Sequence, residues 1–267
     1  MSHKFLIHSN NTPSSKSTEE FLRQKLEMAG IPVSDALEDD VDLIICIGGD
    51  GALLRAVHDY DFPTIPFMGI NTGHLGFFQE IAPDELDMFI EDYLEEEFSI
   101  QPMMTIKAIV EHDDTRDEFT ALNEVAVKSN GNHTVHLDIS IGGGLIESFS
   151  GDGVLISTPA GSTAYNYSLR GSIVDPRLEL LQVTPIAPMN STAYRSFTSS
   201  ILLPPDLSLG IVPGVSESIC TLLVTHDSFS EEYENVSKIE VKLSDQKVNL
   251  LRFGNYDFWS KVKEKFL

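Results

Sequence analysis

A glycine-rich loop around one carboxylate is the feature of this sequence best suited to chemistry. Gly48, Gly49 and Gly51 surround Asp50, after an apolar run and before a segment of helical character. Glycines at such a junction let backbone N–H groups approach a ligand, and the following helix N-terminus favours phosphate. Asp50 would repel phosphate unless it binds Mg²⁺ or accepts a proton from an attacking hydroxyl. The alternative is a tight turn in which Asp50 caps the helix.

A second Gly-Asp-Gly string, centred on Asp152, precedes a β-rich run and a turn of small hydroxyl residues. Ser162 and Thr163 could cap a helix that begins there while their N–H groups face a ligand. Tyr165 offers an aromatic surface on which a base can stack. The alternative is a β-to-helix corner with ordinary caps.

Asn123 and Glu124 stand together at the head of a β-rich run. An amide and a carboxylate can hold vicinal ribose hydroxyls between them. Neighbouring side chains on a strand point to opposite faces, so both reach one ligand only at a bulge or a strand end. The alternative is a polar pair on the surface.

The segment from Asn71 to Phe77, Asn-Thr-Gly-His-Leu-Gly-Phe, holds two glycines three residues apart. This spacing indicates a turn whose backbone lies close to another chain segment or to a ligand. Asn71 and His74 could reach a phosphate or a ribose, although a histidine in a turn is more often exposed to solvent than functional.

The first hundred residues alternate between strand and helix patterns, which favours an α/β layer domain. The continuous apolar run 41–47 is typical of a strand buried on both faces of a parallel sheet. The polar stretch 10–18 precedes a segment of helical spacing that starts at Thr18. The expected strands are 4–8, 41–47 and 66–70, and the expected helices are 18–28, a segment starting at 52, and 83–98.

After Ser99 the pattern changes to short β-rich runs separated by Gly, Pro or Asn, which predicts an all-β domain. One helix is expected near 162–169. A terminal helix from 257 onward would present Trp259, Val262 and Phe266 on one face. The expected strands are 105–110, 123–127, 135–141, 145–149, 154–157, 200–203, 219–224 and 238–243.

The overall composition of the chain disfavours nucleic acid and membranes as binding partners. The formal charge of −23, from 41 acidic and 18 basic residues, disfavours nucleic acid as a partner. No segment has the apolar length of a membrane span or a signal peptide, so we expect a cytoplasmic protein without a membrane partner. Cys46 lies in an apolar run, which favours a buried free thiol over a disulfide with Cys220.

The order and spacing of these motifs resemble the NAD kinase family, in its short Gram-positive form, over residues 4–260. The resemblance implies an α/β N-terminal domain and an all-β, sandwich-like C-terminal domain, with a C-terminal helix returning to the first. We expect the α/β domain to span 1–100, with 250–267 packed back on it, and the β-rich NAD-binding domain to span 101–249. The family resemblance also implies that the protein forms a homotetramer and uses ATP as co-substrate. It implies a divalent metal, Mg²⁺, whose protein ligands the sequence leaves unknown.

By this resemblance, Asp50 is the catalytic carboxylate that activates the adenosine ribose 2′-hydroxyl of NAD, directly or by organising Mg²⁺–ATP. The donor's phosphates would lie against Gly48, Gly49 and Gly51. The residues expected to bind NAD are Gly51, Asn71, His74, Phe77, Asn123, Glu124, Asp152, Ser162, Thr163, Ala164, Tyr165 and Ser168.

The sequence departs from the family pattern at three places. Ala52 and Ala160 stand where the family usually has threonine, and Arg170 stands where a small residue, often glycine, is common. Loss of two hydroxyls leaves open a regulatory module that binds NAD without turnover. A related sugar or lipid kinase is the other alternative, because such kinases share the Gly-Gly-Asp-Gly loop. A dehydrogenase is disfavoured, since the glycines lack the G-x-G-x-x-G spacing.

Overall fold

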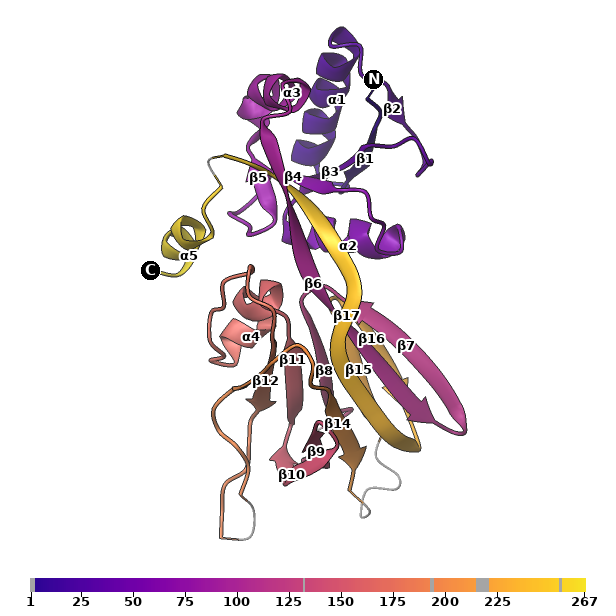
Figure 1. The fold of residues 1–267 in the computed structure, drawn as a ribbon, viewed down its shortest axis with the longest axis vertical. Coiled ribbons are helices and arrows are strands. Elements are labelled where there is room, and N and C mark those ends of the chain that lie inside the picture. The colour runs from indigo at the N-terminus through magenta and orange to yellow at the C-terminus, as the bar shows by residue number, and fades with distance from the viewer. Residues whose placement is uncertain (1–2, 132, 193–194, 215–220, 255) are drawn as a thin grey trace. The chain divides into compact units, whose positions relative to one another are not determined.

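The computed structural model describes residues 3–131, 133–192, 195–214, 221–254 and 256–267. The chain divides into two compact units, one formed by residues 1–102 and 247–267 and the other by residues 103–246 (Figure 1). Two long strands, β6 (Phe98–His112) and β17 (Val236–Phe253), contribute residues to both units.

A parallel sheet in the order β2-β1-β3-β4 forms the centre of the first unit. Every residue of β3 is buried, as its apolar run predicted. Both β5 and the end of β17 pair with β4, the latter through Leu250 and Phe67. The strands are β1 (Phe5–Ser9), β2 (Val33–Ser34), β3 (Leu43–Gly48), β4 (Phe67–Asn71) and β5 (Gln79–Ile81).

The helices of this unit are α1 (Pro13–Met28), α2 (Asp50–Asp59) and α3 (Leu86–Leu94), the last preceded by a 3₁₀ turn at Pro83–Glu85. The predicted start of this helix at residue 18 was wrong, because α1 begins at Pro13. Thr12 caps it by accepting the N–H of Ser15, and proline is well tolerated in a first turn. Ser15 and Thr18 are buried although they are polar.

The C-terminal helix α5 (Phe258–Phe266) packs within the first unit, as the sequence predicted. The Phe77 ring lies 5.6 Å from that of Phe258 and 5.7 Å from that of Phe266. The predicted face was wrong in one residue: Trp259 is 49% exposed, and Phe258 is buried in its place beside Val262. Asp257 caps the helix by accepting the N–H of Trp259 at 3.1 Å.

The second unit is a two-sheet sandwich, and this confirms the predicted fold class. One sheet has the order β13-β12-β11-β8-β15-β16, and the other brings β9, β10 and β14 beside β17, β6 and β7. Both sheets contribute to a single apolar core, which includes Val125 and Ile156 from one and Leu137 and Ile239 from the other. The strands not yet given are β7 (Thr115–Ala121), β8 (Glu124–Ser129), β9 (Val135–Ile141), β10 (Gly144–Gly151), β11 (Gly153–Ser157), β12 (Leu181–Ile186), β13 (Ile201–Leu203), β14 (Leu209–Pro213), β15 (Leu222–His226) and β16 (Phe229–Tyr233).

Strand β12 was not predicted, because it contains Pro185, and proline is disfavoured inside a sheet. The register explains how it is accommodated. Strand β13 pairs only with residues 181–183 of β12, so Pro185 lies beyond its end with β11, at Val154, as its strand neighbour. The predicted run 219–224 begins in residues outside those that the structure describes, and β15 starts at Leu222.

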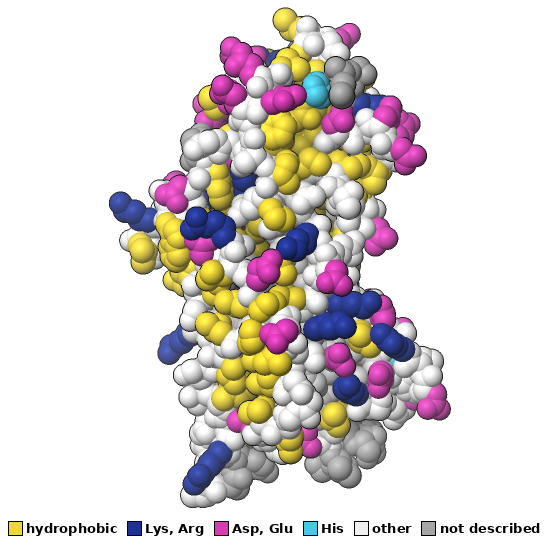
Figure 2. All heavy atoms as spheres, in the orientation of Figure 1, with side chains coloured by type: hydrophobic (Ala, Val, Ile, Leu, Met, Phe, Trp, Pro, Cys, Tyr) yellow, Lys and Arg dark blue, Asp and Glu magenta, His cyan; other side chains and the backbone are white. Residues whose placement is uncertain are grey.

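Cys46 is a buried free thiol in β3, as predicted, and its burial raises the thiol pKa. Cys220 lies outside the described residues. None of the helices in the described ranges is long and apolar enough to cross a membrane. Acidic side chains are spread over the face shown in Figure 2, with lysines and arginines among them.

Candidate functional site

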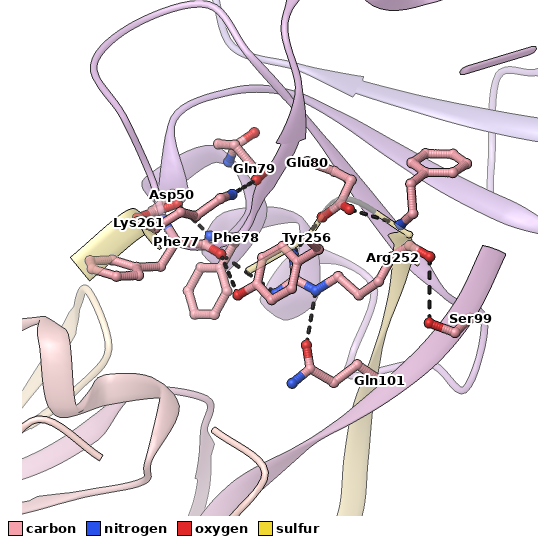
Figure 3. A network of polar contacts seen from close by, with 11 residues as sticks. Asp50, Phe77, Phe78, Gln79, Glu80, Ser99, Gln101, Arg252, Tyr256 and Lys261 are labelled. Carbon is pink, nitrogen blue, oxygen red and sulfur yellow. Dashed lines mark hydrogen bonds and ion pairs between the residues drawn. The ribbon is translucent and has the colours of Figure 1, made fainter. Parts of the chain in front are cut away.

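Asp50 is the first residue of α2, and its side chain does not cap that helix. The N-cap is Gly49, which makes no side-chain cap. The carboxylate instead accepts the backbone N–H of Phe77 at 2.9 Å and that of Phe78 at 3.0 Å, one on each oxygen (Figure 3). The alternative in which Asp50 is a capping residue is therefore wrong. A half-buried carboxylate is held in one orientation and keeps further lone pairs for a ligand.

Gly76 makes this approach possible, and sequence reasoning did not single it out. A Cβ atom at residue 76 would lie 2.2 Å from Oδ1 of Asp50 and 2.8 Å from its Cγ. No ordinary contact is that short, so any side chain here would displace the carboxylate. The glycine was visible in the 71–77 motif, but its reason is a contact with a loop 26 positions earlier in the printed sequence.

The three glycines around Asp50 differ in their surroundings. A Cβ atom at Gly48 would meet Ala52 at 2.6 Å and Asn10 at 2.7 Å, so this glycine serves local packing. Gly49 and Gly51 have nothing within 4 Å of an added Cβ. Open space beside them leaves room for a ligand against the start of α2.

The other predicted residues of the first unit follow β4. Asn71 ends this strand, and its Oδ1 accepts the N–H of Gly73 at 3.1 Å, which forms the turn. His74 is exposed. The Phe77 ring is buried against α5, so its amide rather than its ring reaches Asp50.

A buried ion pair holds the far end of the segment that carries these amides (Figure 3). Arg252 lies 2.8 Å from Glu80, and their side chains are only 4% and 1% exposed. The second oxygen of Glu80 accepts the N–H of Phe253 at 2.8 Å. The guanidinium also donates to Gln101 at 2.9 Å and lies 3.6 Å from the centre of the Tyr256 ring. Residues 77–80 are thus tied to both Asp50 and β17.

Lys261 reaches the same segment from α5. Its ammonium donates to the backbone carbonyl of Gln79 and lies 5.0 Å from the Tyr256 ring centre. Burial is the main cause that lowers the pKa of Lys261 to about 8, and the charge of Arg252 adds to it. The negative charges of Glu80 and Asp50 act in the opposite direction.

In the second unit, Asn123 and Glu124 lie where β8 begins, as a shared ligand would require. Both are buried, at 6% and 8% exposure, so the alternative of a surface pair is wrong. Oδ1 of Asn123 and Oε2 of Glu124 have no hydrogen-bond partner among the described residues. Buried acceptors are normally satisfied, so this neighbouring pair indicates a place for donors from a ligand.

Asp227 holds this strand end in place. Its carboxylate accepts the N–H groups of Leu122, Asn123 and Glu124 at 2.9, 2.7 and 3.3 Å. Burial raises the pKa of Glu124 to about 8, Asp227 adds to the rise, and the backbone N–H of Tyr165 opposes it. No local pattern in the sequence indicates Asp227, because its contacts lie about a hundred residues away.

The predicted helix near 162–169 is shorter than expected and uncapped by side chains. A 3₁₀ turn at Ala160–Thr163 leads into α4 (Tyr165–Ser168), so the prediction that Ser162 and Thr163 cap a helix was wrong. The Ser162 hydroxyl donates to the carbonyl of Val174 at 3.2 Å and accepts its N–H at 3.0 Å. Thr163 and Ala164 are half-buried, and Ser168 is exposed.

Asp152 and Tyr165 line a surface hollow of about 460 Å³. Lys128, which sequence reasoning missed, lies in the same hollow with its ammonium 5.7 Å from the Tyr165 ring centre. Burial raises the pKa of the Tyr165 hydroxyl, and the charges of Asp152 and Glu124 add to the effect. The residues that line the hollow are Lys128, Ser129, Gly131, His133, Thr134, Asp152, Tyr165, Ile186 and Leu223.

The predicted site residues therefore form one group in each unit. Residues 48–51 and 71–77 belong to the first, and Asn123, Glu124, Asp152 and residues 162–168 belong to the second. Within the described ranges, no group of three or more His, Cys, Asp or Glu side chains is arranged to hold a metal ion.

Two family models cover most of the chain. The ATP-NAD kinase N-terminal domain matches residues 6–98, and the ATP-NAD kinase C-terminal domain matches residues 122–253. The fold and these matches define the class as a two-domain kinase of the ATP-NAD type.

Relatives that match over nearly their full length show the family within this class. The NAD kinase of Finegoldia magna is 40% identical, and the match covers 98% of this chain and 97% of the relative. The NAD kinase of Lactobacillus acidophilus is 35% identical over 99% of this chain and 97% of the relative. This chain belongs to the NAD kinase family.

Solved structures agree on the fold. Yeast NADH kinase complexed with NADH superposes with a TM-score of 0.86 at 20% identity, over 99% of this chain and 87% of that one. An NAD kinase from Archaeoglobus fulgidus in complex with ATP gives a TM-score of 0.77 at 20% identity, over 98% of this chain and 99% of that one.

Proposed function

We propose that this protein transfers the terminal phosphoryl group of ATP, or of another phosphate donor, to the 2′-hydroxyl of the adenosine ribose of NAD. The full-length relatives that carry the name NAD kinase support this activity. The observation that carries the chemistry is the fixed carboxylate of Asp50 beside glycines with open space.

Asp50 is the base of this reaction. Its carboxylate accepts the proton of the 2′-hydroxyl as the ribose oxygen bonds to the terminal phosphorus. The bond from that phosphorus to its bridging oxygen breaks, and ADP leaves with NADP as the product. Phosphoryl transfer depends mainly on positioning, and a positioned base adds about 10²–10⁴-fold in rate. The amides of Phe77 and Phe78 supply the positioning.

NAD is held by the second group of residues. The unpaired oxygens of Asn123 and Glu124 accept two ribose hydroxyls, and Tyr165 stacks on a base. Asp152, Ser162, Thr163, Ala164 and Ser168 complete this part of the site in the proposal, and Asn71, His74, Phe77 and Gly51 contribute from the first unit. Gly48, Gly49 and Gly51 lie against the donor's phosphates.

Three further features belong to the proposal through the family resemblance. Mg²⁺ accompanies ATP, since such ions draw ligands from substrate phosphates and water. The protein assembles as a homotetramer. It acts in the cytoplasm.

The test is a phosphorylation assay on the purified protein with Mg²⁺–ATP or polyphosphate as donor. NAD, NADH, fructose 6-phosphate and diacylglycerol are offered separately as acceptors. We expect NADP or NADPH, detected with an NADP-specific dehydrogenase. Turnover of only the sugar or the lipid would assign a related kinase, and NAD binding without any turnover would assign a regulatory module; either result contradicts the proposal.

A further inference from the structure

A lysine on the C-terminal helix reaches the backbone segment that holds Asp50. The segment 77–79 donates two N–H groups to the Asp50 carboxylate and offers the Gln79 carbonyl to the Lys261 ammonium (Figure 3). One short stretch of backbone therefore joins the carboxylate of α2 to the ammonium of α5. Moving either end moves the amides that orient the carboxylate.

The charged side chains that act on Lys261 are Arg252, Glu80, Asp50 and Glu264. On β5, Glu80 is already paired with Arg252 of β17 at 2.8 Å, and it also accepts a backbone N–H. Glu264, on α5 itself, is exposed. Asp50, on α2, is held by the Phe77 and Phe78 amides, and the Lys261 ammonium donates to the Gln79 carbonyl.

Packing alone does not call for a lysine at residue 261. Removing an ammonium from water costs free energy, and an apolar side chain such as methionine could fill the same space against Tyr256 without that cost. The exposed Lys263, two residues later on the same helix, shows the usual arrangement, in which the charge stays in solvent.

We propose that Lys261 is a positioning residue for the phosphoryl transfer: its ammonium fixes the Gln79 carbonyl, so that the Phe77 and Phe78 amides stay on the Asp50 carboxylate. This inference rests on the proposed function. It assigns the C-terminal helix a part in the reaction as well as in packing.

The protonation of Lys261 gives this role a recognisable pH dependence. Because the pKa of Lys261 is about 8, the ammonium is lost within a range where enzyme assays are practical. Wild-type kcat/KM should therefore fall on the alkaline side, with a midpoint near pH 8. Arginine stays protonated throughout this range, so Lys261→Arg should keep its activity to higher pH.

The experiment compares kcat/KM between pH 5.5 and 10 for wild type, Lys261→Arg, Lys261→Met and the matched control Lys263→Met. We expect Lys261→Met to lose the alkaline fall and to keep, at every pH, the low kcat/KM that wild type reaches only above its midpoint, because methionine cannot donate to the Gln79 carbonyl. Lys263→Met should follow the wild-type profile. Circular dichroism and thermal melting establish that each variant is folded.

A Lys261→Met profile that matches the wild-type profile overturns the inference, as does an alkaline fall that persists in Lys261→Arg. Should Lys261→Met not fold, the wild-type and Lys261→Arg profiles still decide it. A wild-type protein without NAD phosphorylation contradicts the proposed function instead, so the two failures are distinct.

Discussion

Gly76→Ala is the sharpest test of the geometry around Asp50. The added methyl carbon would lie 2.2 Å from Oδ1 of Asp50 and 2.8 Å from its Cγ. An ordinary carbon–oxygen contact is about 3.2 Å or longer, so carboxylate and loop must separate by about 1 Å. A misplacement of about 1 Å can reduce a rate by about 10²-fold. We therefore expect kcat to fall about a hundredfold.

The matched control is Gly73→Ala in the same loop, where an added Cβ meets nothing within 4 Å. It should keep near wild-type kcat. Both rates come from NADP formation at saturating NAD and ATP, with folding checked by circular dichroism. If folded Gly76→Ala retains more than half of the wild-type kcat, the carboxylate does not need the position described, and the reasoning fails.

Four further substitutions test other parts of the structure. Arg170 has a φ of 64°, a conformation that glycine adopts without strain, so Arg170→Gly should raise the free energy of unfolding by about 1 kcal/mol in urea titration, and a decrease would contradict this. Arg252→Met leaves Glu80 buried without its ion pair and should cost about 3–5 kcal/mol; a loss under 1 kcal/mol in the same titration would show that the pair contributes little. Asp227→Asn weakens the hold on the β8 end and should raise the KM for NAD several-fold with a smaller change in kcat, whereas an unchanged KM removes Asp227 from the account. The pKa of the Glu124 carboxyl is raised to about 8 in the folded protein, so the folded state loses stability as the pH rises from the pKa of the unfolded chain toward 8. Glu124→Gln should therefore raise Tm at pH 8 and leave Tm unchanged near pH 4.5. Equal Tm values for the variant and wild type at pH 8 would refute the raised pKa.

Strands and helices with strong local patterns could be predicted from the sequence. The buried run of β3, the alternation of β9 and the amphipathic C-terminal helix all have signals within a dozen residues. Strand β12 was missed because the tolerance of Pro185 depends on where its neighbour β13 ends. The start of α1 was missed because its first residues are polar, and Ser15 is buried although it is polar.

The same limit applies to the candidate site. The glycine-rich loops and the Asn123–Glu124 pair each consist of residues adjacent in sequence, so they could be recognised as motifs. Asp227 and Lys261 act through backbone groups roughly a hundred or more residues away in the chain, and no local pattern encodes such contacts. Even Asp50 had two interpretations until its partners Phe77 and Phe78 excluded the capping role.

The most direct test of the account is the rate of NADP formation by Asp50→Asn. The amide keeps the size of the side chain but cannot accept the hydroxyl proton as a carboxylate does. We expect kcat to fall by about 10²–10⁴-fold, while calorimetry shows NAD binding close to that of wild type. A purified Asp50→Asn protein that forms NADP at near the wild-type rate would contradict the central claim.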